Sequence, residues 1–449
     1  MTPDTIFAPT TAPGRAAVAV VRLSGAGCAA VCRCLTGLPP PPGRRAALRR
    51  LTDPVSGEAL DRGLVLFFPA PASFTGEDVL ELQIHGGRAV LAGVLDALAG
   101  LPGLRAAEPG EFSRRAFLNG RLDLTAAEGL ADLVAAETRA QASQALRQLE
   151  GELGRRYDDW RERLLGALAR LEAAIDFAPE EEDVPADLLA TVGPEVDRLS
   201  AEIAAHLEDG ERGERLREGL TIAVVGPPNA GKSSLVNRLA RRDVAIVAAR
   251  PGTTRDVLEV HLDLRGYPVT LLDTAGLRET TDEVEVEGVR RARERAARAD
   301  LRLLLLDGAV WPEVDAATLA LLDADALGVV NKADLGRVPE CPALGGRAAL
   351  ALSCRTGAGF ERLLATLGAM AAERMAPGMT PLLTRSRHRS ALQATLAALD
   401  RFGRAADGGE LALLAEDLRL ATRALGRITG RVGVDDILDR IFAEFCIGK

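Results

Sequence analysis

The 449-residue chain has few aromatic residues, few cysteines and no long apolar run, and each shortage excludes a class of protein. Six cysteines are too few for a disulfide framework in a chain of this length. No stretch reaches the ~18 uninterrupted apolar residues of a membrane span. The start, MTPDTIFAPT, lacks the basic region and apolar run of a secretory signal. We therefore expect a reduced, cytoplasmic protein without a membrane anchor.

The charge and the composition limit the possible functions and the number of domains further. A net charge of −9 argues against a nonspecific nucleic-acid coat but allows local basic patches. A hydrophobic share of 47% is enough for sizeable cores, and the length favours two to four domains. Cys28, Cys32 and Cys34 cluster, but their spacing matches no tetrahedral zinc pattern. We expect them to be small buried residues of a helix.

The apolar pattern changes along the chain in a way that predicts separate domains. The first part mixes strand-like runs, at 17–23, 64–68 and 79–84, with turns and a helix after Gly87, which is typical of an α+β domain. The next part has the three-and-four spacing of amphipathic helices, broken by an acidic run at 180–183 that we interpret as a solvated loop. Short apolar strands, at 221–225, 269–272, 301–306, 328–330 and 348–352, then alternate with helical stretches, as in a doubly wound α/β domain, before the helical pattern returns. The predicted domains are residues 1–118, a helical domain in two parts, 119–217 and 377–449, and an inserted domain, 218–376. Composition alone also allows domains in series.

A phosphate-binding loop stands at the start of the α/β segment. Gly226–Ser233, GPPNAGKS, matches the pattern G-x-x-x-x-G-K-[ST]. The loop follows the predicted strand Thr221–Val225 and opens a predicted helix, which is the context that the pattern requires. Its backbone N–H groups suit phosphate oxygens, Lys232 adds a positive charge, and the Ser233 hydroxyl is a ligand for Mg²⁺.

Four later segments, nearly all at strand ends, identify the base and the metal. Asp273–Gly276 offers a carboxylate for Mg²⁺ through water and an N–H group for the γ-phosphate. Gly252–Asp256 offers a threonine for Mg²⁺. Asn331–Asp334 offers a carboxylate that accepts from the N1 and 2-amino edge of guanine, and the backbone of Ser353–Arg355 suits the guanine oxygen. These segments predict a GTPase specific for guanine.

The residue after the Asp273–Gly276 segment is unusual. Ras-like enzymes have a glutamine there that orients the attacking water, whereas this chain has Leu277. Some other group must place the water and neutralise charge. The carboxylates of Asp282–Glu287 are candidates, although a solvated acidic face is the simpler interpretation of each. The Asn229 side chain is a candidate ligand for a monovalent cation such as K⁺ beside the phosphates.

The chain resembles the MnmE family, also called TrmE, of tRNA-modification GTPases. The resemblance rests on GPPNAGKSSLVNRLA, RPGTTRD, LLDTAGLRETTDEVE, NKADL and the terminal FCIGK. The N-terminal stretches DTIFAPTTAPGRAAVAVVRLSG, SFTGEDVLELQIHGG and EPGEFSRRAFLNGRLDLTAAEGLADLV are as close to the family and more specific than the GTPase motifs. The resemblance covers nearly the whole chain.

This resemblance implies a multidomain fold and a reaction. The fold has an α+β N-terminal domain that binds folate and forms the homodimer, an all-α helical domain, and an inserted α/β P-loop, Ras-like G domain. With a flavoprotein partner, MnmG (GidA), family members add an aminomethyl or carboxymethylaminomethyl group at carbon 5 of the wobble uridine of tRNA. The one-carbon unit comes from 5-formyl- or 5,10-methylene-tetrahydrofolate. GTP hydrolysis depends on K⁺ and accompanies pairing of the two G domains.

The resemblance also assigns roles to residues. Glu285 would orient the hydrolytic water, and Cys446 is the terminal cysteine close to the one-carbon chemistry. The residues implied for the metals are Ser233 and Thr254 for Mg²⁺, and Asn229, Ala248, Arg250 and Thr253 for K⁺. Those implied for folate are Arg22, Glu81, Arg121 and Lys449. The predicted GTP-binding residues are Asn229, Ala230, Gly231, Lys232, Ser233, Ser234, Ala248, Thr253, Thr254, Asp273, Thr274, Ala275, Gly276, Asn331, Lys332, Asp334, Ser353, Cys354 and Arg355.

Two alternatives belong to other classes. The first is a regulatory or ribosome-assembly GTPase without covalent chemistry on RNA, which the G motifs alone do not separate from the main hypothesis. The second is a lipid-anchored GTPase, suggested only by the CIGK end. Acidic residues precede Cys446 where an anchor needs a basic run, so we expect no membrane partner. No basic stripe in the sequence identifies a surface for tRNA.

Overall fold

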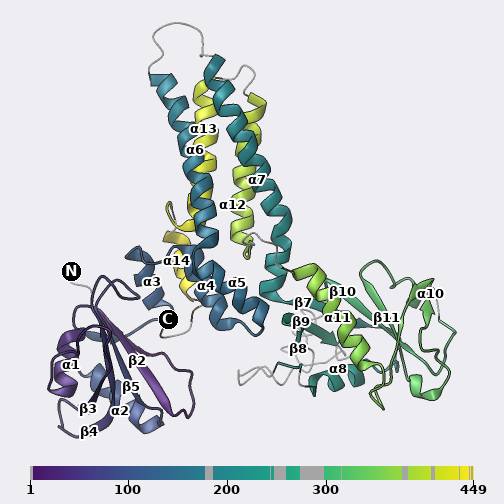
Figure 1. Cartoon of the computed structure of the whole chain (residues 1–449), viewed down its shortest axis with the longest axis horizontal. Helices are drawn as coiled ribbons and strands as arrows, with labels where there is room; N and C mark the ends of the chain where they lie inside the picture. Colours follow the sequence, from purple (N-terminus) through teal and green to yellow (C-terminus); the bar gives the residue numbers. More distant parts are fainter. Residues whose placement is uncertain are drawn as a thin grey trace, which may run out of the picture. The chain divides into compact units, whose positions relative to one another are not determined.

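A computed structural model describes residues 4–176, 186–242, 244–246, 259–273, 298–314, 316–376, 383–405, 410–433, 435–443, 445 and 448 (Figure 1). The chain divides into two compact units. Unit 1 comprises Met1–Ala131, Gln148–Gly193 and Arg401–Lys449, and unit 2 comprises Asp132–Arg147 and Pro194–Asp400. This division is coarser than the predicted domains, because it passes through helices of the helical segment. The exact domain boundaries stay a prediction.

The N-terminal part of unit 1 is built on a six-stranded sheet in the order β3-β4-β5-β2-β1-β6. Neighbouring strands are antiparallel except β1 and β6, which are parallel. The elements are β1 (Thr5–Pro9), β2 (Val18–Ser24), α1 (Cys28–Thr36), β3 (Ala47–Thr52), β4 (Ala59–Phe68), β5 (Val79–His85), α2 (Arg88–Ala99) and β6 (Leu104–Ala106). The predicted strands at 17–23, 64–68 and 79–84 and the helix after Gly87 are confirmed.

The two faces of this sheet differ, as the alternation of side chains along a strand requires. One face buries Val21, Leu82 and their neighbours in a core with side chains of α1 and α2. The other face, which we call the outer face, carries Arg22 of β2 opposite Glu81 of β5. The two side chains that the family resemblance assigns to folate therefore share the face that α1 and α2 leave open.

Helices from both ends of the chain pack together in unit 1. Its helical elements are α3 (Glu111–Leu118), α6 (Glu152–Asp176), α13 (Leu411–Thr429) and α14 (Asp435–Ala443), while α4 (Leu124–Ala135), α5 (Arg139–Leu149), α7 (Ala186–Glu218) and α12 (Ser386–Ala405) extend over both units. Arg419 of α13 contacts Glu172 of α6 at 3.0 Å, although 247 residues separate them. This packing favours an inserted α/β domain over domains in series. No described helix has the length and apolar character of a bilayer span.

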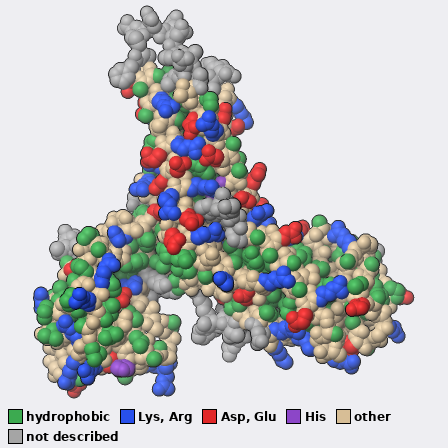
Figure 2. All heavy atoms as spheres, in the orientation of Figure 1, with side chains coloured by type: hydrophobic (Ala, Val, Ile, Leu, Met, Phe, Trp, Pro, Cys, Tyr) green, Lys and Arg blue, Asp and Glu red, His purple; other side chains and the backbone are tan. Residues whose placement is uncertain are grey.

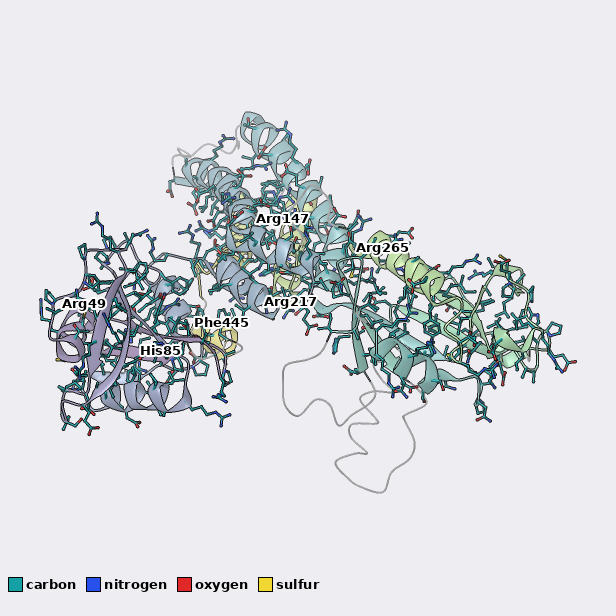
Figure 3. All side chains as sticks on the ribbon, turned by 60° about the horizontal axis from the view of Figure 1, so that its bottom comes forward. Arg49, His85, Arg147, Arg217, Arg265 and Phe445 are labelled. Carbon is teal, nitrogen blue, oxygen red and sulfur yellow. The ribbon has the colours of Figure 1, made fainter. Side chains whose placement is uncertain are left out.

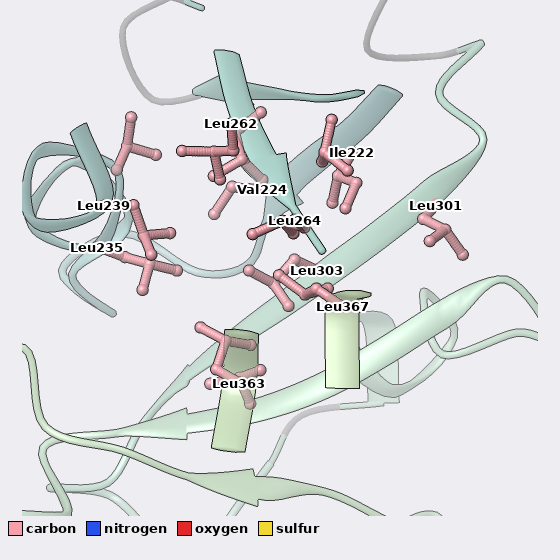
Figure 4. Close-up of a cluster of buried hydrophobic side chains, with 14 of the residues drawn as sticks. Ile222, Val224, Leu235, Leu239, Leu262, Leu264, Leu301, Leu303, Leu363 and Leu367 are labelled. Atoms are coloured by element: carbon pink, nitrogen blue, oxygen red, sulfur yellow. The ribbon is translucent and has the colours of Figure 1, made fainter. Parts of the chain in front are cut away.

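The α/β part of unit 2 is a sheet in the order β14-β11-β10-β7-β9-β8. Its strands and helices are β7 (Leu220–Val225), α8 (Lys232–Ala240), β8 (Glu259–Leu264), β9 (Tyr267–Asp273), β10 (Leu301–Asp307), α10 (Ala316–Leu319), β11 (Ala326–Asn331), the 3-10 turn η3 (Ala333–Leu335), β12 (Ala343–Leu344), β13 (Arg347–Ala348), β14 (Leu350–Ala351) and α11 (Phe360–Met375). All neighbours are parallel except β8 and β9. Ile222 and Val224 of β7 pack with leucines of β8, β10, α8 and α11 in its core (Figure 4).

Two sequence expectations need correction. The last predicted strand, 348–352, is interrupted: β13 pairs with β12 in a small hairpin, and only Leu350–Ala351 joins the main sheet. Cys34 is exposed, while Cys28 and Cys32 are buried, because only positions 28, 32 and their helical neighbours face the sheet. Among the described residues, no three or more His, Cys, Asp and Glu side chains lie close enough together to hold a metal ion. The acidic run at 180–183 lies outside the described residues.

Candidate functional site

The carboxyl ends of the parallel strands bring the predicted nucleotide-binding segments to one edge of the sheet. Val224, just before the phosphate loop, lies opposite Asp273 at the end of β9. Asp307 at the end of β10 lies opposite Asn331 at the end of β11. In open α/β sheets this edge is where ligands bind. The phosphate loop, Asp273 and Asn331 therefore lie at the same edge of the sheet.

The phosphate loop depends on glycines at two points of close approach. Gly226 has φ 140°, and a Cβ atom there would lie 2.1 Å from the carbonyl oxygen of Leu305. Gly231 has φ 99°, and its Cβ would lie 2.3 Å from Nδ2 of Asn331. Any larger residue at either position would push the loop away from β10 or β11. The tight loop ends at α8, so the first N–H groups of that helix face the same region.

Lys232 closes this loop on itself. Its Nζ donates to the carbonyl oxygens of Gly226 and Pro227 at 2.8 and 2.9 Å. Burial lowers the pKa of Lys232, and the nearby carboxylate of Asp273 acts in the opposite direction. The ammonium group is thus held inside the loop, where it suits phosphate oxygens.

Asn331 connects the phosphate loop to the loop after β14. Its Nδ2 donates to the carbonyl oxygen of Ala230 at 2.8 Å, and its Oδ1 accepts from the Cys354 N–H at 3.0 Å. The side chain is 2% exposed, so both bonds are shielded from water. One amide therefore fixes the distance between the segment predicted to bind phosphate and the segment predicted to bind the base.

Asp334 is held by two residues of the loop after β14. The Ser353 hydroxyl donates to its Oδ1, and Arg355 Nη2 lies 2.7 Å from its Oδ2. The Ser353 hydrogen bond and the charge of Arg355 lower the pKa of Asp334. An ionised carboxylate accepts hydrogen bonds only, which is the chemistry needed to read the N1 and 2-amino edge of guanine. Next to it, Lys332 has φ 61° and contacts Asp307 at 2.6 Å.

The donors available for cations are oxygen atoms. Ser233 is exposed at the first turn of α8, and Asp273 ends the neighbouring strand β9. Hydroxyl and carboxylate oxygens are what Mg²⁺ prefers, so these residues fit the ion. Asn229 is exposed, with φ 64°, so its amide oxygen is available to a cation. The other predicted residues of this site lie outside the described residues: Ala248, Arg250, Thr253, Thr254, Thr274, Ala275, Gly276 and Glu285. Ser234 is exposed on α8.

A second candidate site lies on the outer face of the N-terminal sheet. Arg22, Glu81 and Arg121 line one cavity of about 300 Å³. Arg22 Nη2 lies 2.9 Å from Glu81 Oε1, and the Arg22 guanidinium lies 5.5 Å from the centre of the Phe74 ring. The remaining lining residues are Arg44, Phe68, Ala72, Ser73, Phe74 and Val79. Three cations, one carboxylate and aromatic rings suit a flat heterocycle that carries carboxylates.

The end of the chain approaches the same strands. A Cβ atom on Gly448, which has φ 96°, would lie 2.5 Å from the carbonyl oxygen of Pro9 at the end of β1. Ala8, the residue before Pro9, lies opposite Arg22 in the sheet. Phe445 is buried and its ring lies 5.4 Å from that of Phe442. The predicted residues Cys446 and Lys449 themselves lie outside the described residues.

The structure adds residues that the sequence did not identify. Asp307 pairs with Lys332, and Arg44 lines the second cavity. Asp307 ends the buried strand β10, and an acidic residue at the end of an apolar run can be recognised in the sequence. No motif in the sequence contains Arg44. His85, at the end of β5 (Figure 3), precedes two glycines, and this sequence is as typical of a turn histidine as of a catalytic one. Asp61 accepts from its backbone N–H and lies 2.8 Å from its Nδ1, which anchors the turn.

Two family models of known proteins match the chain. The family model of the GTP-binding protein TrmE N-terminus matches residues 5–121. The model of the MnmE helical domain matches residues 124–446. The second match covers more than half of the chain and includes both helical parts with the α/β domain between them.

Curated relatives match over their full length. The tRNA modification GTPase MnmE of Parvibaculum lavamentivorans is 57% identical over 450 residues, which are 99% of this chain and 100% of its own. The proteins of the same name from Paramagnetospirillum magneticum and Rhodospirillum rubrum are also 57% identical. Those matches cover 99% and 100% of this chain, respectively, and 100% of each relative.

Proposed function

The chain belongs to the MnmE family of tRNA modification GTPases, and we propose that it hydrolyses GTP in the modification of the wobble uridine of tRNA. One observation carries this proposal: the phosphate loop, Asp273, Asn331 and Ser353 gather at one edge of a parallel sheet. Asp334 beside them offers ionised acceptors for guanine. A site of this kind serves phosphoryl transfer by positioning and by electrostatic stabilisation.

Hydrolysis is proposed to depend on K⁺ as well as Mg²⁺. Asn229 supports this, because its side chain is exposed within the phosphate loop. A cation there supplies positive charge beside the phosphates, which Leu277 cannot do. Ala248, Arg250 and Thr253 are the proposed further K⁺ residues, Ser233 and Thr254 the Mg²⁺ residues. Glu285 is the proposed group that orients water.

The second cavity is proposed to bind a tetrahydrofolate. Arg22 and Arg121 suit glutamyl carboxylates, and Glu81 suits the N–H edge of a pterin. When bound, the folate supplies a one-carbon unit. Lys449 is proposed to complete the site, with Cys446 close to it, and the contact of Gly448 with β1 supports this. MnmG, the flavoprotein of the family, is the proposed partner in the chemistry on tRNA, and the cytoplasm is the proposed location.

A homodimer is proposed to form through the N-terminal domain. Exposed apolar side chains lie on the outer face of its sheet, where Leu48 of β3 is directly opposite Leu64 of β4. Leu48 is 57% exposed and Leu64 38%. Neighbouring exposed leucines on an open sheet face favour burial against a second copy. In such a dimer the folate cavity, on the same face, lies close to the interface.

The proposed function is tested by nucleoside analysis of tRNA. A bacterial strain that lacks its own family member is complemented with this chain, and the wobble uridine is quantified by mass spectrometry. We expect the modification to return with the wild type and not with Arg22→Ala, which removes a folate contact. Loss of modification with Arg22→Ala while GTP hydrolysis persists separates this function from a regulatory GTPase. Normal modification in the uncomplemented strain would refute it.

A further inference from the structure

Arg238, in the last turn of α8, contacts the loop that is proposed to read the guanine base. Its Nη1 donates to the carbonyl oxygens of Cys354 and Arg355 at 2.7 and 3.2 Å. Helix α8 thus begins at the phosphate loop with Lys232, and Arg238 in its last turn contacts the base loop, by which we mean residues 353–358. No motif in the sequence pointed to this arginine.

The surroundings of Arg238 are built to hold it in place. Its guanidinium lies 5.3 Å from the centre of the Phe360 ring, which is fully buried. Gly357 has φ 89°, and a Cβ atom there would lie 2.3 Å from Arg238 Nη2. The loop therefore needs a glycine at this point to leave room for the guanidinium.

The hydrogen bonds of the loop leave one backbone donor free. The N–H groups of Cys354 and Thr356 donate to side chains, Asn331 Oδ1 and Ser353 Oγ. The N–H groups of Ser353, Gly357 and Ala358 also have acceptors within the loop. In residues 353–358, all of which the structure describes, only the Arg355 N–H has no acceptor.

Arg238 determines where that free donor points. The Cys354 carbonyl and the Arg355 N–H belong to one planar trans peptide unit, so they point in opposite directions. By holding the carbonyl on the α8 side, Arg238 directs the N–H to the other side. Ser353 and Arg355 of the same loop contact Asp334, the proposed reader of guanine N1 and the 2-amino group. The oxygen O6 is next to N1 on the ring.

We propose that Arg238 is a positioning residue for guanine recognition: it holds the loop carbonyls so that the Arg355 N–H donates to guanine O6. This inference rests on the proposed guanine site. Helix α8, which follows the phosphate loop, would then also fix the backbone conformation of the base loop.

The test measures dissociation constants for GDP and two analogues with the full-length protein. In 6-thio-GDP a sulfur, a weak acceptor, replaces O6, and IDP keeps O6 but lacks the 2-amino group. We expect Arg238→Ala to weaken GDP binding about tenfold, the scale of one charge-assisted hydrogen bond. The preference for GDP over 6-thio-GDP should shrink, while the preference for GDP over IDP, which reports on Asp334, should not change.

Arg242→Ala is the matched control. Arg242 also lies over the Phe360 ring, at 5.2 Å, and pairs with Glu361, but it makes no bond to the loop carbonyls. Arg242→Ala should therefore leave both preferences unchanged.

Arg238→Lys keeps the positive charge but has only one donor nitrogen. This variant should give an intermediate preference for GDP over 6-thio-GDP. It also keeps the test valid if the alanine variant unfolds.

The outcomes distinguish the inference from its premise. If the wild type binds ADP as tightly as GDP, the proposed guanine site is wrong. If the wild type prefers GDP and Arg238→Ala and Arg238→Lys both keep the full preference for GDP over 6-thio-GDP, the role of Arg238 is wrong.

Discussion

At the residue scale, the carboxylate of Asp334 needs to stay ionised to recognise guanine. The hydrogen bond from Ser353 is the largest cause that lowers its pKa below the ordinary value of 3.8, and Arg355 adds to it. A lowered pKa means that the ionised form persists as the pH falls to the ordinary value and is lost only below it. The preference for GDP over IDP, which reports on Asp334 and cancels the titration of the diphosphate that both ligands share, should therefore be level from neutral pH down to about pH 4.5.

Replacing Ser353 tests this. In Ser353→Ala the pKa of Asp334 rises toward its ordinary value, so the preference for GDP over IDP should begin to fall at a higher pH than in the wild type. Titrations with GDP and with IDP at steps between neutral pH and about pH 4 give the two profiles of this preference. The variant also loses the Thr356 bond to Ser353, so some affinity is lost at every pH. Profiles with the same midpoint would contradict the prediction.

Single residues show how far sequence patterns lead. Lys232, Asn331 and Asp334 belong to motifs with fixed spacing, so their positions at the strand ends were predictable. Arg238 and Arg44 carry no motif, because their roles depend on which backbone atoms the fold brings within reach. A pattern of one strand or helix contains no information about such partners.

At the element scale, helix α3 is fixed by an ionic network in which Glu111 and Arg115 are buried and Arg105 and Asp4 are exposed. Glu111 accepts from Arg105 of β6 at 2.8 Å and from Arg115 at 3.0 Å, and Arg115 also contacts Glu77 and Asp4. Burial raises the pKa of Glu111, but hydrogen bonds from Arg105, the Glu108 N–H and Arg115 outweigh burial and hold the pKa below 4.5. The network thus joins α3 to the edge strand β6.

We expect Glu111→Gln to destabilise the fold by about 1–3 kcal/mol at neutral pH, since it leaves buried donors with weaker partners. Because the folded-state pKa is lowered, the carboxylate stabilises the fold fully above pH 4.5 and loses this effect as the pH falls through the folded-state value. Urea unfolding at neutral pH and near pH 4 measures the difference. Glu108→Gln, exposed and without a side-chain ion pair in the described structure, is the control.

Strands were predictable where both faces are buried or where alternation is clear. The hydrophobic run of β10 and the alternating β5 follow directly from their residues. Strand β8, with half-buried positions and mixed polarity, was missed, because its antiparallel pairing with β9 comes from the turn between them. Strand β3 was missed for a similar reason: two arginines and an exposed leucine obscure its alternation.

At the scale of the whole molecule, one face offers no charge signal for an RNA surface. Figure 2 shows acidic and basic side chains interspersed on the face in view. The sequence, with its net charge of −9, contains no basic stripe that identifies such a surface either. The face in view therefore does not single out a site for tRNA.

The proposed dimer connects the N-terminal domain with GTP hydrolysis, because the pairing of G domains that the family resemblance implies needs two copies of the chain held together. Leu64→Glu places a charge on the outer face of the N-terminal sheet, where burial against a second copy would be costly. We expect a monomer by light scattering, with GDP affinity unchanged, since the nucleotide site belongs to the other unit. GTP turnover in K⁺ should fall to the rate in Na⁺, because G domains in separate monomers rarely pair.

Two controls separate dimerisation from catalysis. Val55→Glu adds the same charge at a residue that is 92% exposed in the turn between β3 and β4, so the dimer and its stimulation by K⁺ should persist. Glu285→Ala should keep the dimer and the GDP affinity but lose hydrolysis, since only the proposed water-orienting group is removed. A Leu64→Glu protein that stays dimeric would move the interface to another surface, and a monomer with full K⁺ stimulation would show that pairing is not needed for turnover.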